Sequence, residues 1–432
     1  MRRRPARAKR RNYGEIMDET TMRRRKQLIL WCGVVLFFFT SMSKVLVPGA
    51  VFNDLQALGF GAGAIASLGA WYMYTYAFSQ MAVGIFSDRY GGVRLLLFGG
   101  GFFAAGSLLF PLGTAYPVLF AARVLAGMGS GTVYLGVSKL ICDLYSERFA
   151  LVFGTVLFLG YLGPITGVLP MAWLIQTVTW RWAMAVPAAF AVGSMLVITL
   201  SARGCIKPTV PGNCFAALWK LIRDRRNIAL FLASSTVFGS YYALLTGAGY
   251  KCLEDVCGMT RMQSSTLLTA MAVLVSLENL LIAPLLKLCG GRRKAILLFA
   301  LICALCASLL GAAAFHWRLP TYAAAAAFVL QAIPAGFFSL FAIIAKELNP
   351  PERSGLAVST LNFCAFVMIA LVSDVAGALL NRSTGAAKLV GKLVIYPPEA
   401  YRNIFILFAV VAVAGLVCGF GVPETRNDAG KR

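Results

Sequence analysis

The chain has 432 residues, of which 59% are hydrophobic and only 13% are charged. A soluble globular protein carries about twice that charged share, so the composition excludes a molecule whose whole surface faces water and favours one surrounded largely by lipid. The formal net charge of +23 is compatible with nucleic-acid binding. However, Lys and Arg stand at the ends of apolar runs, as the positive-inside bias of membrane proteins predicts, and we expect no nucleic-acid partner.

Histidine and cysteine give little support to a metal centre. The chain has 1 His and 11 Cys, without a CxxC…CxxC pattern, so we expect neither a metal site nor a cofactor. Most cysteines fall inside apolar runs, which argues against a disulfide framework. Cys252 and Cys257 flank a predicted outer loop, and the sequence leaves open whether they pair.

The first segment in chain order is an Arg-rich stretch, residues 1–27, which also holds three acidic residues. It is too long and too mixed for a signal peptide, and we interpret it as a cytoplasmic tail. Twelve apolar runs follow, each long enough to cross a bilayer as a helix. They lie near residues 28–50, 63–86, 95–115, 117–141, 149–173, 180–202, 228–250, 262–286, 294–315, 320–345, 354–380 and 401–422.

A basic segment divides these runs into six and six. The predicted organisation is a tail (1–27), an N-terminal six-helix bundle (28–202), a cytoplasmic linker loop (203–227), a C-terminal six-helix bundle (228–422) and a second tail (423–432). Only residues 114–117 separate the third and fourth runs, so one span could be miscounted there.

The distribution of basic residues predicts the orientation. With both termini in the cytoplasm, 29 of the 37 Lys and Arg residues in the tails, loops and outermost positions of the runs lie on the cytoplasmic side. Such a bias is typical of proteins of the inner (plasma) membrane, and moving the count by one helix would destroy it.

The two halves of the chain repeat each other. Residues 91–94 read Gly-Gly-Val-Arg after the second run, and residues 290–293 read Gly-Gly-Arg-Arg after the eighth. A second echo, residues 146–148 and 351–353, follows the fourth and tenth runs. Duplicated six-helix halves are typical of secondary transporters, whose binding site lies between the repeats near the middle of the membrane.

Several motifs carry a resemblance to a known family. The segment 84–94 reads G-x-x-x-D-R-x-G-x-x-R and resembles the loop between helices 2 and 3 of the major facilitator superfamily, although Gly92 and Val93 stand where that pattern usually has one residue. Residues 123–129 resemble the second motif of the family, and 160–167 the third, in which Val168 replaces the last glycine. The resemblance covers the chain from about residue 28.

The resemblance implies an all-α membrane protein with twelve transmembrane helices in two pseudo-symmetric six-helix bundles. It also implies a transporter in a lipid bilayer that works by alternating access, and we expect a monomer. Residues 72–94 most resemble bacterial carriers related to organic-anion and dipeptide transporters.

A cytoplasmic gate is also implied by the resemblance. It would be formed by Asp88, Arg89 and Arg94 of the signature loop together with Asp143 and Glu147 below the fourth helix. The alternative is a loop that only anchors the orientation of the chain in the membrane.

Five ionisable residues fall inside the predicted spans, where each costs about 2.5–3.5 kcal/mol on insertion scales and is a functional candidate. Lys44 would bind an anionic substrate or extend to the outer interface. Arg123 would order helix packing or tune a proton site, and Lys139 can extend to the cytoplasm. Glu278 and Asp374 would carry the coupling proton or form structural contacts.

In the major facilitator superfamily, which the chain resembles, helices 1, 4, 7 and 10 line the cavity. Tyr241, Tyr242 and Gln331 lie on the seventh and tenth runs and are therefore further substrate-binding candidates, although aromatic residues at such positions often serve packing alone.

The preferred function is proton-coupled import of a small organic anion by a symporter. Efflux of drugs or metabolites by antiport is an alternative, which the altered third motif disfavours, and facilitated movement of dipeptides is another. A membrane-embedded transferase belongs to a different class and would need an acid–base constellation that the sequence does not offer. We expect a carrier rather than an enzyme.

Overall fold

The computed structural model describes residues 5–206, 215–288 and 290–425, and within helices it leaves out the side chains of 5–19, 84–89, 150, 215–217, 280, 283, 287 and 351–352. The N-terminal half consists of α1 (Pro5–Leu46), α2 (Phe52–Ala57), α3 (Ala62–Leu112), α4 (Tyr116–Leu144), η1 (Ser146–Arg148), α5 (Phe149–Thr177) and α6 (Trp180–Ser201). The C-terminal half consists of α7 (Phe215–Arg223), α8 (Arg225–Ala243), η2 (Leu244–Ala248), α9 (Gly249–Asp255), α10 (Arg261–Leu288), α11 (Arg293–His316), α12 (Thr321–Gly336), α13 (Phe338–Glu347), α14 (Pro351–Arg382), η3 (Thr384–Ala386), β1 (Lys388–Val390), β2 (Leu393–Ile395) and α15 (Pro398–Phe420).

These elements form twelve membrane spans in two six-helix bundles, as the sequence predicts. Ten helical segments of the described chain are long and apolar enough to cross a membrane, and the first part of α3 and α10 complete the set. The third and fourth spans are separate helices, because α3 ends at Leu112 and α4 begins at Tyr116.

Several spans are interrupted within the membrane. The helix α8 continues through the π-helical segment η2 into α9, so residues 225–255 form one span. The tenth span is divided at Phe337 into α12 and α13. Such interruptions free backbone groups and are tolerated in membranes where they are buried in protein.

The second and third spans join at a sharp kink in α3. Gly91 has φ 70° and ψ 158°, a conformation that L-residues with a side chain rarely adopt. The chain therefore turns between the two spans at a single glycine of the signature loop.

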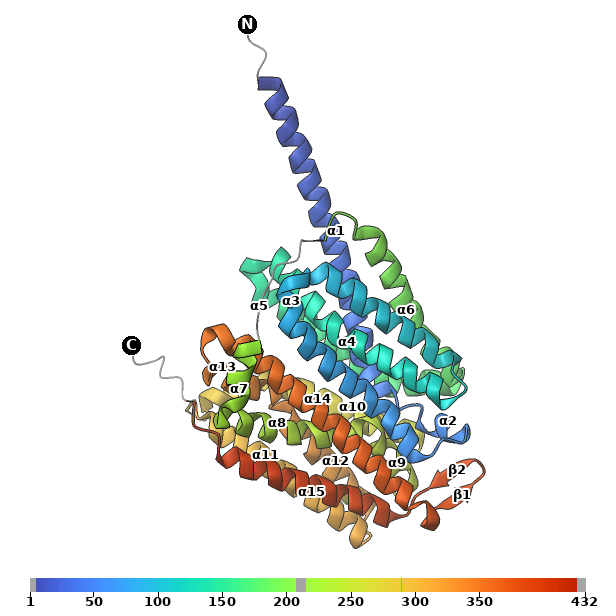
Figure 1. The fold of residues 1–432 in the computed structure, drawn as a ribbon. Coiled ribbons are helices and arrows are strands. Elements are labelled where there is room, and N and C mark those ends of the chain that lie inside the picture. The colour runs from blue at the N-terminus through green and yellow to red at the C-terminus, as the bar shows by residue number, and fades with distance from the viewer. Residues whose placement is uncertain (1–4, 207–214, 289, 426–432) are drawn as a thin grey trace.

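The halves lie side by side, with their helices roughly aligned (Figure 1). They contact each other mainly through α3 against α14 and α5 against α10. One end of the bundle carries the starts of α8 and α11 and the ends of α6 and α15, and we name it the terminal end. The other end carries α2, α9 and the β-hairpin, and we name it the opposite end (Figure 1).

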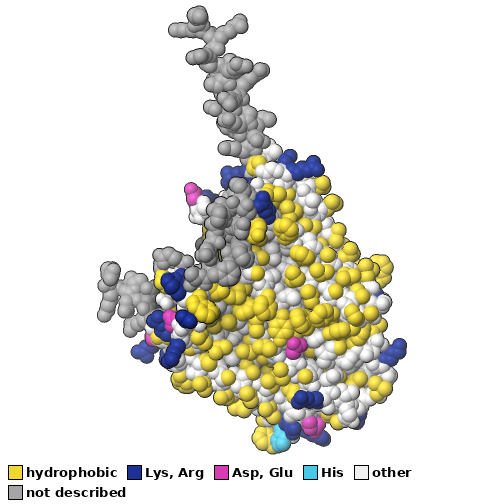
Figure 2. Space-filling model, in the orientation of Figure 1, with side chains coloured by type: hydrophobic (Ala, Val, Ile, Leu, Met, Phe, Trp, Pro, Cys, Tyr) yellow, Lys and Arg dark blue, Asp and Glu magenta, His cyan; other side chains and the backbone are white. Residues whose placement is uncertain are grey.

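The surface reflects the two environments. Apolar side chains cover the middle of the visible face, and Lys and Arg gather toward the ends of the helices (Figure 2). Large apolar side chains on the outside of the bundles are well exposed, including Leu151, Trp182 and Val417. Their exposure is expected where the solvent is lipid rather than water.

Three features were not expected from the sequence. The predicted tail is partly helical, since α1 begins at Pro5. The linker contains the amphipathic helix α7, in which Leu221 is buried and Trp219 is 55% exposed. A two-stranded antiparallel hairpin, β1 and β2, connects α14 to α15 and turns at Gly391 with φ 62°. The last seven residues of the predicted C-terminal tail lie outside the described chain.

Candidate functional site

A cavity of about 350 Å³ lies between the two halves, near the middle of the bundle. Residues of α1, α3, α4 and α5 line it on one side and residues of α8, α13 and α14 on the other. The cavity extends to the terminal end, where the exposed Lys346 of α13 forms part of its lining. Its position between repeated halves matches that of binding sites in secondary transporters.

The charge of this cavity is positive. Lys44 and Lys346 line it, and the described lining contains neither Asp nor Glu. Four uncharged polar side chains also belong to the lining: Ser41, Gln80, Ser339 and Asn362. An anion entering from water would therefore meet two ammonium groups and several hydrogen-bonding groups.

Lys44 lies near the end of α1 and is only 7% exposed. Its Nζ stands 4.1 Å from the ring centroid of Tyr76 and 4.9 Å from that of Phe366. No carboxylate in the described chain lies within ion-pairing distance of it. Two aromatic faces thus contact its ammonium, since the negative face of a ring attracts a cation.

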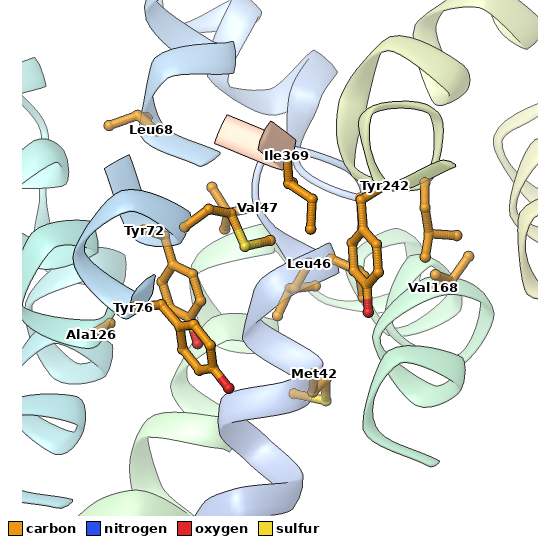
Figure 3. Close-up of a cluster of buried hydrophobic side chains, with 14 of the residues drawn as sticks. Met42, Leu46, Val47, Leu68, Tyr72, Tyr76, Ala126, Val168, Tyr242 and Ile369 are labelled. Atoms are coloured by element: carbon orange, nitrogen blue, oxygen red, sulfur yellow. The ribbon is translucent and has the colours of Figure 1, made fainter. Parts of the chain in front are cut away.

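Aromatic side chains form much of the cavity wall. Tyr76 and Tyr242 lie on either side of the end of α1 (Figure 3), and Tyr134 and Tyr161 also belong to the lining. An apolar wall with a few polar groups is typical of a site for a small organic molecule.

The structure separates the substrate-binding candidates that the sequence suggested. Lys44 and Tyr242 line the same cavity, whereas Tyr241 and Gln331 are not among its lining residues. Tyr241 packs against Tyr242 with ring centroids 5.3 Å apart. Gln331 is fully buried within the C-terminal half, where its Oε1 accepts a hydrogen bond from Ser308 at 3.4 Å.

Arg123 is 2% exposed and is bound by the backbone of neighbouring helices. Its guanidinium donates to the carbonyl oxygens of Leu68 (3.1 Å), Ser43 (3.2 Å) and Val47 (3.1 Å). A further bond reaches Ser43 Oγ at 3.0 Å, and the guanidinium lies 4.1 Å from the ring centroid of Tyr72. Arg123 thus satisfies carbonyls at the end of α1 that a helix leaves without partners.

The two acidic candidates lie apart from each other. Glu278 on α10 packs against Gly336 and has a buried Oε2 without a hydrogen-bond partner in the described chain. Asp374 on α14 interacts with Tyr74 of α3, across the boundary between the halves. Neither is among the described residues that line the central cavity.

The predicted cytoplasmic gate is only partly described. The side chains of Asp88 and Arg89 lie outside the described residues. Arg94 is half-buried on α3, and Asp143 and Glu147 are exposed at the end of α4 and in η1, at the terminal end of the bundle.

The opposite end holds a set of polar contacts that sequence reasoning missed. We name them the opposite-end contacts: Asn53 Nδ2 donates to Glu254 Oε2 at 2.5 Å, Arg261 pairs with Asp54 at 3.1 Å, and Gln56 donates to the carbonyl of Val394 at 3.4 Å. In each, α2 of the N-terminal half binds the C-terminal half. Burial raises the pKa of Asp54, although the Arg261 guanidinium opposes this shift.

Beneath these contacts lies a buried ion pair. Lys251 and Asp255 are 2.9 Å apart, and both side chains are 2% exposed. Asp255 also accepts from the backbone amide of Tyr396 at 2.9 Å and from the hydroxyl of Tyr401 at 2.7 Å. Lys251 further approaches Asn53 Oδ1 at 3.4 Å. One sequence signal could have pointed to these contacts. A polar run, residues 53–56, follows the first span, and residues 251–255 occupy the corresponding place in the second repeat.

Comparison with known proteins agrees with this architecture. The profile of the Major Facilitator Superfamily matches the chain twice, over residues 29–250 and 230–431. The chain belongs to the major facilitator superfamily. Among solved structures of similar fold, a POT family transporter in complex with 5-aminolevulinic acid has a TM-score of 0.72 and 14% identity, covering 91% of this chain and 96% of the other. The nucleoside transporter NupG (D323A mutant) has a TM-score of 0.68 and 13% identity, covering 91% and 99%.

Curated members of the superfamily resemble the chain to different extents. A probable 4-methylmuconolactone transporter of Cupriavidus pinatubonensis is 24% identical and covers 91% of this chain and 87% of its own length. Multidrug resistance protein D of Escherichia coli is 29% identical over 37% of this chain and 40% of its own. The matches to MFS-type transporters of Mycobacterium tuberculosis and Bacillus subtilis span only 27% and 42% of those proteins.

Proposed function

We propose that this superfamily member is a secondary active transporter that carries a small organic anion, together with a proton, by alternating access. The observation that carries the proposal is the charge of the central cavity, whose described lining has two lysines and no carboxylate. A carboxylate is the matching ligand for an ammonium held among aromatic walls, because a charge-assisted hydrogen bond is strong where water is scarce.

The proposed substrate site consists of Lys44 and Tyr242, with Tyr241 packed against Tyr242 and Gln331, buried outside the cavity lining, as a more distant member. The proton would be carried by Glu278 or Asp374. The Oε2 of Glu278, which has no hydrogen-bond partner among the described residues, supports this role, since a buried carboxylate oxygen without a partner is costly unless a proton or ligand satisfies it at some stage.

The proposed orientation puts the terminal end in the cytoplasm, with both termini inside and the molecule a monomer in the plasma membrane. The basic residues of the loops at that end support it. In this orientation the opposite-end contacts close the outer side of the cavity. Reporter fusions after Gln27, near Thr209 and after Arg432 test it, and an extracellular signal at any of them refutes it.

The proposed cytoplasmic gate keeps Asp88, Arg89 and Arg94 of the signature loop with Asp143 and Glu147. Asp88→Asn should reduce transport while leaving expression intact, because it removes a charge from a contact that must form and break. Near-normal uptake by this variant would leave the loop only a role in orientation.

Two other functions have specific support. Efflux of drugs is favoured by the similarity to Multidrug resistance protein D, whereas Val168 in the third motif speaks against it. Dipeptide movement stays an alternative because the fold is shared with a peptide transporter POT, which is 16% identical, although a shared fold does not fix the substrate. A transferase would show turnover without saturable movement of its substrate.

Uptake into proteoliposomes tests the proposal. The panel consists of aliphatic and aromatic carboxylates, 4-methylmuconolactone, dipeptides, neutral sugars and cationic dyes, each measured with and without a proton gradient. We expect saturable uptake and counterflow of at least one organic anion, and faster uptake when the outside is acidic. Saturable movement confined to cations or neutral solutes would refute the anion assignment.

A further inference from the structure

The ammonium of Lys44 touches both halves of the molecule. Lys44 and Tyr76 belong to the N-terminal half, on α1 and α3, whereas Phe366 belongs to α14 in the C-terminal half. The Nζ atom lies 4.1 Å from the centroid of Tyr76 and 4.9 Å from that of Phe366. The two rings also contact each other, with centroids 4.3 Å apart and planes at 53°. One cation therefore contributes an attraction across the boundary that alternating access must remodel.

This attraction is weaker than the bond that a carboxylate would form. An uncharged ring attracts a cation through its quadrupole alone, whereas a carboxylate oxygen carries negative charge and accepts a charge-assisted hydrogen bond. Lys44 has no carboxylate partner in the described chain and lines the same cavity as the amides of Gln80 and Asn362. An anion in the cavity can consequently replace the rings as the partner of the ammonium.

We propose that Phe366 couples binding to movement of the two halves. With the cavity empty, Lys44 rests against Phe366 and adds to the contact between α3 and α14. When an organic carboxylate binds the ammonium of Lys44, this ammonium moves away from the ring of Phe366. The C-terminal half then loses one of its contacts with the N-terminal half. The proposal rests on the proposed function, and Phe366 acts in it as a positioning residue through Lys44.

The contact between Lys44 and Phe366 can couple anion binding to movement of the two halves, because it joins one half to the other. A ligand shifts an equilibrium between two conformations only as far as it changes their relative free energies. Removing an attraction that exists in only one arrangement of the halves is such a change. A ligand bound to Lys44 without disturbing Phe366 would have no such effect.

The same boundary offers a matched control. Phe363, one helical turn from Phe366 on α14, packs against Phe78 of α3 with centroids 5.2 Å apart and planes at 75°. That contact also joins the two halves through aromatic rings, but neither ring is within cation–π distance of Lys44. Phe363→Leu therefore removes a similar ring from the same boundary without touching the lysine.

Double electron–electron resonance between spin labels tests the empty state. Labels on Leu58 and Leu389, 42% and 72% exposed at the opposite end, report the separation of the halves in a background without native cysteines. Without ligand, Phe366→Leu should raise the population with separated labels about 2- to 30-fold, from the usual strength of a cation–π contact. Phe363→Leu and Phe366→Tyr should stay near the wild-type value. Equal shifts for Phe363→Leu and Phe366→Leu would overturn the proposal.

Addition of an anion tests the release. The probe is the carboxylate that gives the strongest uptake, or benzoate if none does. It should move the wild-type distribution toward that of ligand-free Phe366→Leu and leave that variant unchanged. An equal ligand-induced shift in both proteins would refute the role of Phe366, even if anion uptake is confirmed. If uptake and the wild-type shift are both absent, the anion assignment fails, and the release of Phe366 fails with it.

Discussion

Replacement of Arg123 offers a sharp test of what a buried cation does in this fold. The guanidinium donates four hydrogen bonds, three of them to the carbonyl oxygens of Ser43, Val47 and Leu68. Arg123→Leu would leave these buried oxygens without a described partner. Each such loss costs about 1–3 kcal/mol, while removing a desolvated charge returns part of it. We expect a net destabilisation of about 3–5 kcal/mol.

Thermal unfolding of the purified protein in detergent measures this effect, with fluorescence of the native tryptophans as the signal. Ser43→Ala is the matched control, because it removes only the hydroxyl acceptor and should cost about 0.5–1.5 kcal/mol. Arg123→Lys should fall between them, since one ammonium cannot reach three carbonyls in the geometry of the planar guanidinium. An Arg123→Leu protein that unfolds like wild type but has lost proton-driven uptake would refute the packing role and favour proton coupling.

Three further predictions follow from the site and the fold. Lys44→Gln should weaken anion binding about 10- to 150-fold, which corresponds to one charge-assisted hydrogen bond, and Lys44→Arg should retain part of it; unchanged affinity in competition uptake would contradict the assignment. Asp54→Arg and Arg261→Asp should each change the distance between the spin labels on Leu58 and Leu389, and the double variant, which exchanges the two charges, should restore it. Failure to restore this distance would mean that the pair does not hold the halves together. Gly91→Ala should reduce folded yield by strain of about 1–3 kcal/mol, because φ 70° with ψ 158° is a conformation that essentially only glycine adopts; size-exclusion chromatography measures this yield, and a normal yield would show that the kink tolerates a side chain.

The sequence predicts the membrane spans well because lipid imposes a simple rule. A helix must be apolar over about 20 residues, and that signal is local in the chain. Lys44 could be found for the same reason, since a cation in an apolar run is costly wherever the run lies. The glycine turn at Gly91 also has a local signature.

Other parts of the site have no local signature. The contact of Asn53 with Glu254 joins residues about 200 positions apart, and no periodicity in either segment reveals the partner. Tyr241 and Tyr242 are adjacent, so one helical step of about 100° decides which of them faces the cavity. Phe366 lies in an apolar run among many similar residues, and only the fold brings its ring to Lys44.

The opposite-end contacts have a consequence for how the protein responds to its solution. Arg261 and Asp54 keep 19% and 24% of their side chains exposed, so dissolved ions reach them. At an ionic strength near 0.15 M, charges are screened over about 8 Å, and over about 3 Å at 1 M. Concentrated salt should therefore loosen this end while leaving the Lys251–Asp255 pair, 2% exposed on both sides, largely intact. Buffer composition thus becomes a means of choosing which conformation of the carrier is purified, crystallised or labelled.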